Sequence, residues 1–206
     1  EVDLNKFAGM DCYVGVDLAA TSDLTAVAYL VVLDGTYYFK THYYLPESAL
    51  KDKADKELYK YWKQQGYLTV TSGNVTDYDY ITTDMLRYAD VVNIQSVGYD
   101  KYNATQWAID STEQGLPLEE YPQTLGNFNM PTRELERLIL SGKAVIDNNE
   151  INRYCFRNVT LKSDYNGNVK PNKAVDKKKI DGTIAMIQAL GMYLRTPHYT
   201  NEILTI

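Results

Sequence analysis

The sequence predicts an α/β domain with a mixed β-sheet flanked by helices, and three observations point to this class. Three runs rich in β-forming residues lie within residues 12–44, and Asp34-Gly35 between the last two is a strong hairpin signal because glycine accepts a positive φ. Residues 93–115 pass from β-formers through an aspartate into a helical pattern, which is a βα unit. Apolar residues at helical spacing within residues 179–194 predict a long final helix. A chain of 206 residues with 45% apolar content is long enough to bury one such core.

The remaining elements follow from apolar spacing and from residues that stop helices and strands. Gly66 ends a charged helical stretch that begins at Pro46. Pro131 is expected in the first turn of a helix, where its missing N–H costs nothing, and Gly142 at the end of that helix. The predicted order is strands over 12–17, 26–33 and 36–44, a helix over 46–66, a short strand within 67–71, a helix over 81–92, a strand over 93–99, a helix over 104–115, a strand over 118–125, a helix over 131–142, a strand over 143–147, and helices over 149–158 and 179–194.

A basic segment precedes the last long helix. Residues 161–179 contain the turn signal Asn166-Gly167, Pro171 and six lysines. Turn-forming residues and a concentration of charge are typical of exposed segments, so this stretch is predicted to be a mobile basic hairpin or loop.

The chain is expected to hold one domain over residues 12–195. Its first residue is Glu1 and not methionine, so residues 1–11 are interpreted as a lead-in from a missing upstream domain. Residues 196–206 lack periodicity and are predicted to be a tail. No signal peptide opens the chain, and its longest apolar run is too short to cross a bilayer, so neither a membrane partner nor secretion is expected.

The composition limits the kinds of ligand and metal site that the chain is expected to have. The formal net charge of −6 argues weakly against a general polyanion binder, but it leaves room for a nucleic-acid enzyme whose acids bind metal and whose bases lie on one face. Cys12 and Cys155 are predicted to be reduced core residues, since two cysteines make no disulfide framework. With only two histidines and no CxxC pair, a zinc site is not expected.

Three aspartates lie where the predicted topology can bring them together. Asp17 and Asp100 each end a predicted strand, and Asp181 stands in the first turn of the last helix. Each also has a local structural reason, because aspartate suits turns and helix N-termini. Clustered carboxylates repel one another unless divalent cations lie between them, and Mg²⁺ and Mn²⁺ prefer oxygen ligands. Two such ions can activate a water molecule and stabilise the leaving oxygen of a phosphodiester.

A fourth aspartate has two interpretations of equal weight. Asp23 lies six residues after Asp17 and is near enough in sequence to lend a second metal contact. It also stands directly before a predicted strand, where an aspartate stabilises a turn through its own side chain. Asp23 is therefore a possible metal ligand beside the three others.

Five stretches of the chain carry a family resemblance: GVDLAATSDLTA, WKQQGYLTVTSGNVTDYDYI, VGYDKYNATQ, NMPTRELERLILSGKAV and RNVTLKSDYNGNVKPNKAVDKKKIDGTIAMIQAL. Through them the chain, from Tyr13 to Leu194, resembles the nuclease domain of the large terminase subunit of tailed bacteriophages, of the HK97-like type. The resemblance implies a ribonuclease-H-like fold. It also implies a metal-dependent endonuclease that cuts concatemeric phage DNA during genome packaging.

The resemblance assigns roles and partners as well. It makes Asp17, Asp100 and Asp181 the ligands of two Mg²⁺ or Mn²⁺ ions. It implies double-stranded DNA as the substrate, and a terminase ATPase domain, a small terminase subunit and a portal as partners in the cytoplasm of a bacterial host. The chain has no GxxxxGK[ST] phosphate loop, so the ATPase motor is expected in the missing upstream part.

Contacts to DNA are expected beside the last helix. Lys177, Lys178 and Lys179 are the candidates for phosphate contacts, with a solvated run of charge as the alternative. Asn103 either orients a phosphate or begins a helix. Asp176 is interpreted as a solvated acid next to the lysines.

Two other functions fit the same fold. One is a non-catalytic module that docks a portal or another packaging partner, which the acidic balance and the 19 tyrosines support. The other is a different ribonuclease-H-like DNA enzyme of the resolvase or transposase type. Cleavage that depends on a divalent metal would argue against the first, and a preference for branched DNA would favour the second.

Overall fold

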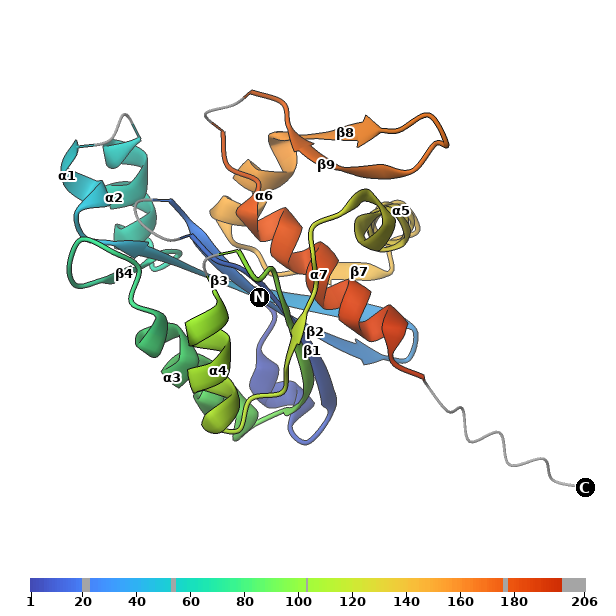
Figure 1. Ribbon diagram of the computed structural model, residues 1–206, viewed down its shortest axis with the longest axis horizontal. Coiled ribbons are helices and arrows are strands. Elements are labelled where there is room, and N and C mark those ends of the chain that lie inside the picture. The colour runs from blue at the N-terminus through green and yellow to red at the C-terminus, as the bar shows by residue number, and fades with distance from the viewer. Residues whose placement is uncertain (20–22, 53–54, 103, 176–177, 198–206) are drawn as a thin grey trace, which may run out of the picture.

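A mixed seven-stranded sheet forms the centre of the computed structural model, which describes residues 1–19, 23–52, 55–102, 104–175 and 178–197 (Figure 1). Its strands are β1 (Asp11–Asp17), β2 (Thr25–Leu33), β3 (Thr36–Pro46), β4 (Thr69–Thr71), β5 (Asn93–Tyr99), β6 (Leu118–Glu120) and β7 (Ala144–Ile146). They lie in the order β4-β3-β2-β1-β5-β6, and β7 adds to β3. The first three strands are antiparallel neighbours, whereas β5 runs parallel to β1 and β6 parallel to β5. The mixed sheet predicted from the sequence is confirmed.

The hairpin between β2 and β3 has the turn that the sequence predicts. Asp34 and Gly35 both have a positive φ, of 50° and 72°. Two successive residues of this kind make the turn that matches the twist of the flanking strands. Leu33 therefore pairs with Thr36, and the register of the two strands is fixed from the turn outward.

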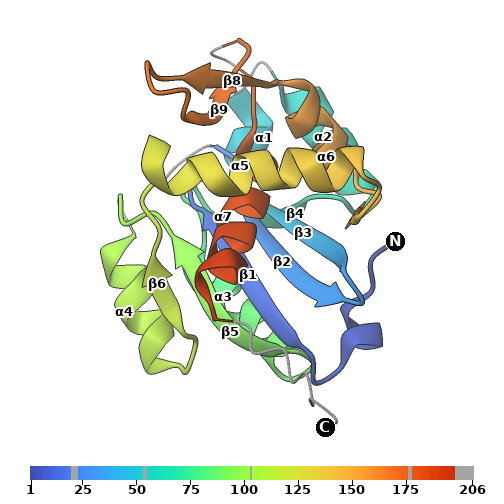
Figure 2. The ribbon, with the colours of Figure 1, turned by 90° about the vertical axis from the view of Figure 1, so that its right-hand side faces the viewer.

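Helices cover both faces of the sheet (Figure 2). On one face α7 lies across β1, accompanied by α5, α6 and α2, whereas α3, α4 and the short 3-10 helix η1 cover the other face. The helices are η1 (Leu4–Phe7), α1 (Ala49–Asp52), α2 (Lys56–Gln64), α3 (Tyr78–Ala89), α4 (Thr105–Glu113), α5 (Leu125–Leu140), α6 (Glu150–Arg157) and α7 (Asp181–Arg195).

The central helix α7 approaches β1 closely because β1 carries a glycine at the crossing point. A Cβ atom on Gly15 would lie 2.1 Å from the carbonyl oxygen of Ala185 and 2.4 Å from the amide nitrogen of Ala189. Only a residue without a side chain fits between strand and helix there. Residues 182–192 are buried, so α7 is a core helix and its first turn is fixed relative to the end of β1.

The prediction for α5 was wrong at its start. The helix begins at Leu125, where the Thr124 side chain accepts a hydrogen bond from the Asn127 N–H, and Pro131 lies inside it. A proline in a helix interior leaves the carbonyl four residues earlier without its usual donor. Here the Tyr121 hydroxyl donates to that carbonyl, of Asn127, at 2.7 Å. This bond from outside the helix replaces the missing one.

The charged stretch after Pro46 was predicted as one helix and is two, α1 and α2. The helix α2 buries Tyr59 and Trp62 and ends before Gly66, which has a φ of 75°. A left-handed glycine after a helix is the usual stop signal, so the predicted end of this stretch is confirmed.

The basic segment before α7 forms the predicted hairpin, outside the main sheet. Strands β8 (Val159–Ser163) and β9 (Val169–Lys173) pair antiparallel. At the tip, the Asp164 carboxylate accepts hydrogen bonds from the N–H groups of Asn166 and Asn168. Arg133 of α5 donates to the Gly167 carbonyl oxygen at 2.6 Å, which ties the tip to the domain. The mobility of the segment stays a prediction.

The two ends of the chain differ. Val2, Leu4 and Phe7 are buried in the same core as α3 and α4, so the segment expected to be a lead-in packs onto the domain. Most of the expected tail lies outside the described residues.

Cys12 and Cys155 are buried and free, as predicted. Among the helices that the structure describes, none has the length and apolar character needed to cross a membrane.

Candidate metal centre

The strand register brings the first two predicted carboxylates together. Val16 of β1 pairs with Tyr99 of the parallel strand β5, and an aspartate follows each of them, Asp17 and Asp100. Parallel neighbours end at the same edge of a sheet, where functional groups of α/β proteins collect. These two carboxylates therefore leave the sheet next to each other.

Asp181 reaches the same edge from the helix layer. It is the first residue of α7, whose packing on Gly15 directs its N-terminus toward the end of β1. A carboxylate at this position is stabilised by the helix dipole. Among the residues that the structure describes, none forms a hydrogen bond with the buried Oδ2 atom of Asp181, so helix capping does not account for this oxygen.

The charges of the other two aspartates act on Asp17. Burial raises the pKa of Asp17 well above its usual value, and the charge of Asp181 and then that of Asp100 add to this effect. Burial raises the pKa of Asp181 to about 6, with the charge of Asp23 as the next cause. Lys173 at the end of β9 lowers both pKa values without cancelling the rise. The charge of Asp17 is therefore repelled by the charges of both neighbouring aspartates.

One residue in contact with the carboxylates was not predicted from the sequence. Gln123, in the loop between β6 and α5, donates from its side-chain Nε2 to Asp17 Oδ1 at 3.0 Å. Its backbone N–H donates to Asp100 Oδ2, also at 3.0 Å. Its carbonyl oxygen accepts a hydrogen bond from Lys170 Nζ of the basic hairpin. No motif marks this position, because its role arises only from the fold.

The lysines expected to bind DNA have different surroundings. Lys179 forms an ion pair with the partly exposed Asp23, which joins the fourth predicted aspartate to the start of α7. Lys178 is exposed and lies 5.6 Å from the centroid of the Tyr154 ring. The other predicted residues of this group lie outside the described part of the chain: Asn103, Asp176 and Lys177.

The donor set suits a hard divalent cation. In the described ranges, no group of three or more His, Cys, Asp or Glu side chains is placed so that it could hold a metal ion as it stands. Mg²⁺, however, is usually bound through one or two carboxylates, with water and substrate phosphates as its other ligands. The charges of Asp181 and Asp100 both raise the pKa of Asp17, and within the described ranges the buried Oδ2 of Asp181 has no hydrogen-bond partner. These observations fit a divalent cation held by the carboxylates.

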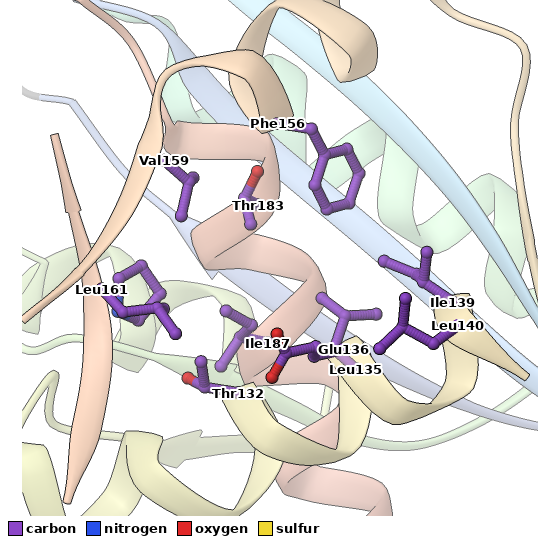
Figure 3. A pocket seen from close by; sticks show the side chains of 11 residues that line it. Thr132, Leu135, Glu136, Ile139, Leu140, Phe156, Val159, Leu161, Thr183 and Ile187 are labelled. Carbon is purple, nitrogen blue, oxygen red and sulfur yellow. The ribbon is translucent and has the colours of Figure 1, made fainter. Parts of the chain in front are cut away.

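An apolar pocket of about 240 Å³ lies elsewhere, between α5, α6, α7 and β8 (Figure 3). Leu135 and Ile139 of α5 and Ile187 of α7 are among its lining residues, and none of the three carboxylates is. The polar residues of its lining, Thr132, Glu136 and Thr183, supply one carboxylate and two hydroxyl groups. The three predicted carboxylates at the edge of the sheet therefore remain the candidate metal centre.

The order of the strands is that of the ribonuclease-H-like class of fold. In this chain, carboxylates lie at the ends of the central parallel strands and at the start of the helix that packs on them. The chain belongs to the terminase large subunit endonuclease domain family, whose model matches residues 1–196. The predicted family is confirmed, and so is the fold class.

Similar sequences and structures agree with this assignment. Protein YmfN of Escherichia coli (strain K12) is 32% identical over 91% of this chain and 44% of its own length. The terminase large subunit of Enterobacteria phage HK97 is 29% identical over 87% of this chain and 36% of that protein. The chain thus spans less than half the length of these relatives.

Two solved structures show the same architecture. The crystal structure of the HK97 bacteriophage large terminase superposes with a TM-score of 0.80 at 28% identity, over 88% of this chain and 39% of that one. The large terminase nuclease of the thermophilic phage G20c gives a TM-score of 0.60 at 12% identity, over 87% and 81%. The second likeness concerns the fold alone.

Proposed function

We propose that this domain is a divalent-metal-dependent endonuclease that hydrolyses phosphodiester bonds of double-stranded DNA with two metal ions. The observation that carries the proposal is the convergence of Asp17, Asp100 and Asp181 at one edge of the sheet, where a buried carboxylate oxygen has no partner in the described part of the chain. Family membership supports nuclease activity. Solved structures of the G20c nuclease contain magnesium in one case and cobalt in another.

In this proposal the aspartates bind metal, and nearby lysines act on the aspartates and on DNA. Asp17, Asp100 and Asp181 would hold the ions through their carboxylate oxygens. When bound, the ions would activate the attacking water and stabilise the leaving oxygen. The protein's own part is to orient the carboxylates, and Lys173 partly offsets the effect of burial by lowering the pKa of Asp17 and of Asp181. Lys178, exposed beside α7, is a suitable contact for a DNA phosphate.

The biological setting follows from the family. Terminase large subunits act in DNA packaging, and we propose that this domain cuts concatemeric phage DNA in the cytoplasm of a bacterial host. Its proposed partners are a terminase ATPase domain, a small terminase subunit and a portal. The family match favours this setting over a resolvase or transposase.

The direct test is cleavage of supercoiled plasmid by the purified domain with Mg²⁺ or Mn²⁺, and with EDTA. We expect nicking and linearisation that need the metal, and a loss of at least about 100-fold in Asp17→Asn and in Asp181→Asn. Asp110→Asn is the matched control, because Asp110 is exposed on α4 and bonds to its neighbour Gln106. Cleavage by Asp17→Asn at the wild-type rate would refute the proposal. A measurable complex with a portal protein, without any cleavage, would favour a docking module instead.

A further inference from the structure

The loop between β6 and α5 contains a residue that contacts two of the candidate metal ligands at once. Gln123 bonds to Asp17 through its side chain and to Asp100 through its backbone. The two aspartates belong to different strands, and their charges repel each other. A donor placed between them satisfies one oxygen of each carboxylate and fixes the direction in which each side chain points.

We propose that Gln123 is a positioning residue of the metal centre: it orients the carboxylates of Asp17 and Asp100 for divalent cations without contacting the reacting atoms itself. This inference rests on the proposed two-metal nuclease. Hydrogen-bond partners behind a ligating carboxylate set its orientation, and losing one typically weakens metal binding or activity by about 10–100-fold.

The number of acceptor sites allows this role. An ionised carboxylate has about four lone-pair sites. On Asp17, Gln123 uses only Oδ1. On Asp100, the N–H groups of Tyr102 and Gln123 use one site on each oxygen. Both carboxylates keep acceptor sites for a cation while the bonds to Gln123 remain.

The neutral charge of the amide also matters. A lysine in this position would satisfy the same oxygens, but it would compete with a metal ion for their charge. The side-chain amide of Gln123 donates to Asp17 and its backbone N–H donates to Asp100, and neither group adds a charge to the site. These two bonds therefore limit the motion of the carboxylates without adding a positive charge that would compete with a cation.

The loop that carries Gln123 is fixed from several directions. The Tyr121 N–H bonds to the Tyr99 carbonyl oxygen at 2.6 Å, and Thr124 caps the next helix. Lys170 of β9 donates to the Gln123 carbonyl oxygen at 3.1 Å. Gln123 is thus held by the strand that precedes Asp100, by α5 and by the basic hairpin. A residue anchored in this way can impose an orientation on its partners.

The test is Mn²⁺ binding by the metal-free domain, measured by isothermal titration calorimetry, in the variant Gln123→Met. Methionine keeps the length of the side chain and removes the side-chain donor to Asp17, while the backbone donor to Asp100 remains. Gln114→Met is the matched control, because Gln114 is exposed at the end of α4 and its side-chain amide donates to the Asp110 carbonyl oxygen of the same helix. We expect binding weaker by about 10–100-fold in Gln123→Met and unchanged in the control.

A second readout uses the wild-type protein and does not depend on how the variant folds. The side-chain NH₂ signal of Gln123 in a ¹⁵N spectrum should shift when Mg²⁺ is added, and this shift should be absent in Asp17→Asn. Mg²⁺ that binds without moving this signal would overturn the inference.

The outcomes separate this inference from the proposed function. Wild-type affinity for Mn²⁺ in Gln123→Met, together with lost binding in Asp17→Asn, would overturn the role of Gln123 and leave the metal centre intact. A wild-type protein that binds no Mn²⁺ would overturn both.

Discussion

Replacing Asp181 by asparagine should stabilise the metal-free domain at neutral pH, although it removes a predicted metal ligand. Burial and the charge of Asp23 raise the pKa of Asp181 from 3.8 to about 6. The folded state therefore binds more protons than the unfolded state between these two values, and the free energy of unfolding falls as the pH rises through this window. The difference corresponds to about 3 kcal/mol at most, lost in full above the folded pKa.

The assay is urea unfolding in EDTA over the range from pH about 3 to about 8, which spans both the usual pKa of 3.8 and the raised pKa of about 6. The wild-type free energy of unfolding should decline with rising pH, and the decline should be smaller in Asp181→Asn by up to about 3 kcal/mol. The Asp110→Asn variant, altered at an exposed site, should follow the wild-type curve. An Asp181→Asn variant with the wild-type pH dependence, or with lower stability at neutral pH, would refute the reasoning.

In the same experiment, added Mg²⁺ should stabilise the wild type more than Asp181→Asn. A ligand that binds only the folded state at 100 times its Kd adds about 2.7 kcal/mol to stability. The wild type should gain stability of this order from saturating Mg²⁺ at neutral pH, and Asp181→Asn should gain much less. Equal stabilisation of both by Mg²⁺ would show that the ion binds away from Asp181.

Two further predictions concern the packing that places the site. Gly15→Ala should lower the free energy of unfolding by about 3 kcal/mol or more in urea titrations, because its Cβ would overlap the backbone of α7; an effect below about 1 kcal/mol would mean that α7 can move away without loss. Tyr121→Phe should lower the free energy of unfolding by about 1–3 kcal/mol, because it leaves the Asn127 carbonyl without a donor. The loss should be much smaller in a Pro131→Ala background, where the N–H of residue 131 can bond to that carbonyl. An equal cost in both backgrounds would contradict the role given to Tyr121.

The carboxylates could be predicted from the sequence because each one ends or begins a regular element. Asp17 and Asp100 follow runs of β-formers, and Asp181 opens an apolar helix, so topology alone places them at one edge. Gln123 could not be predicted in the same way. It lies in a loop without periodicity, and its partners are 106 and 23 residues away in the sequence. Its contacts depend on the register of β1 and β5, which the sequence does not state.

The wrong start of α5 has a similar cause. Local preference places a proline in the first turn of a helix. The donor that makes Pro131 acceptable in the interior is the hydroxyl of Tyr121, which belongs to the preceding loop. A bond between elements thus overrides the local rule, and such bonds become visible only when the elements are packed.

The placement of α7 links the stability of the domain to its proposed chemistry. A helix that begins with a buried, partly unsatisfied carboxylate costs stability in the metal-free protein. The close packing along α7 offsets this cost, since the helix passes Gly15 of β1 and presents Gly182 to the Tyr43 hydroxyl, which in turn donates to Asn152. Small residues at these contacts leave α7 little freedom to move away from Asp17. The core therefore holds the carboxylates close together despite their mutual repulsion. In the proposed metal centre, a divalent cation would remove this repulsion when it binds, and the relief would add to its binding free energy.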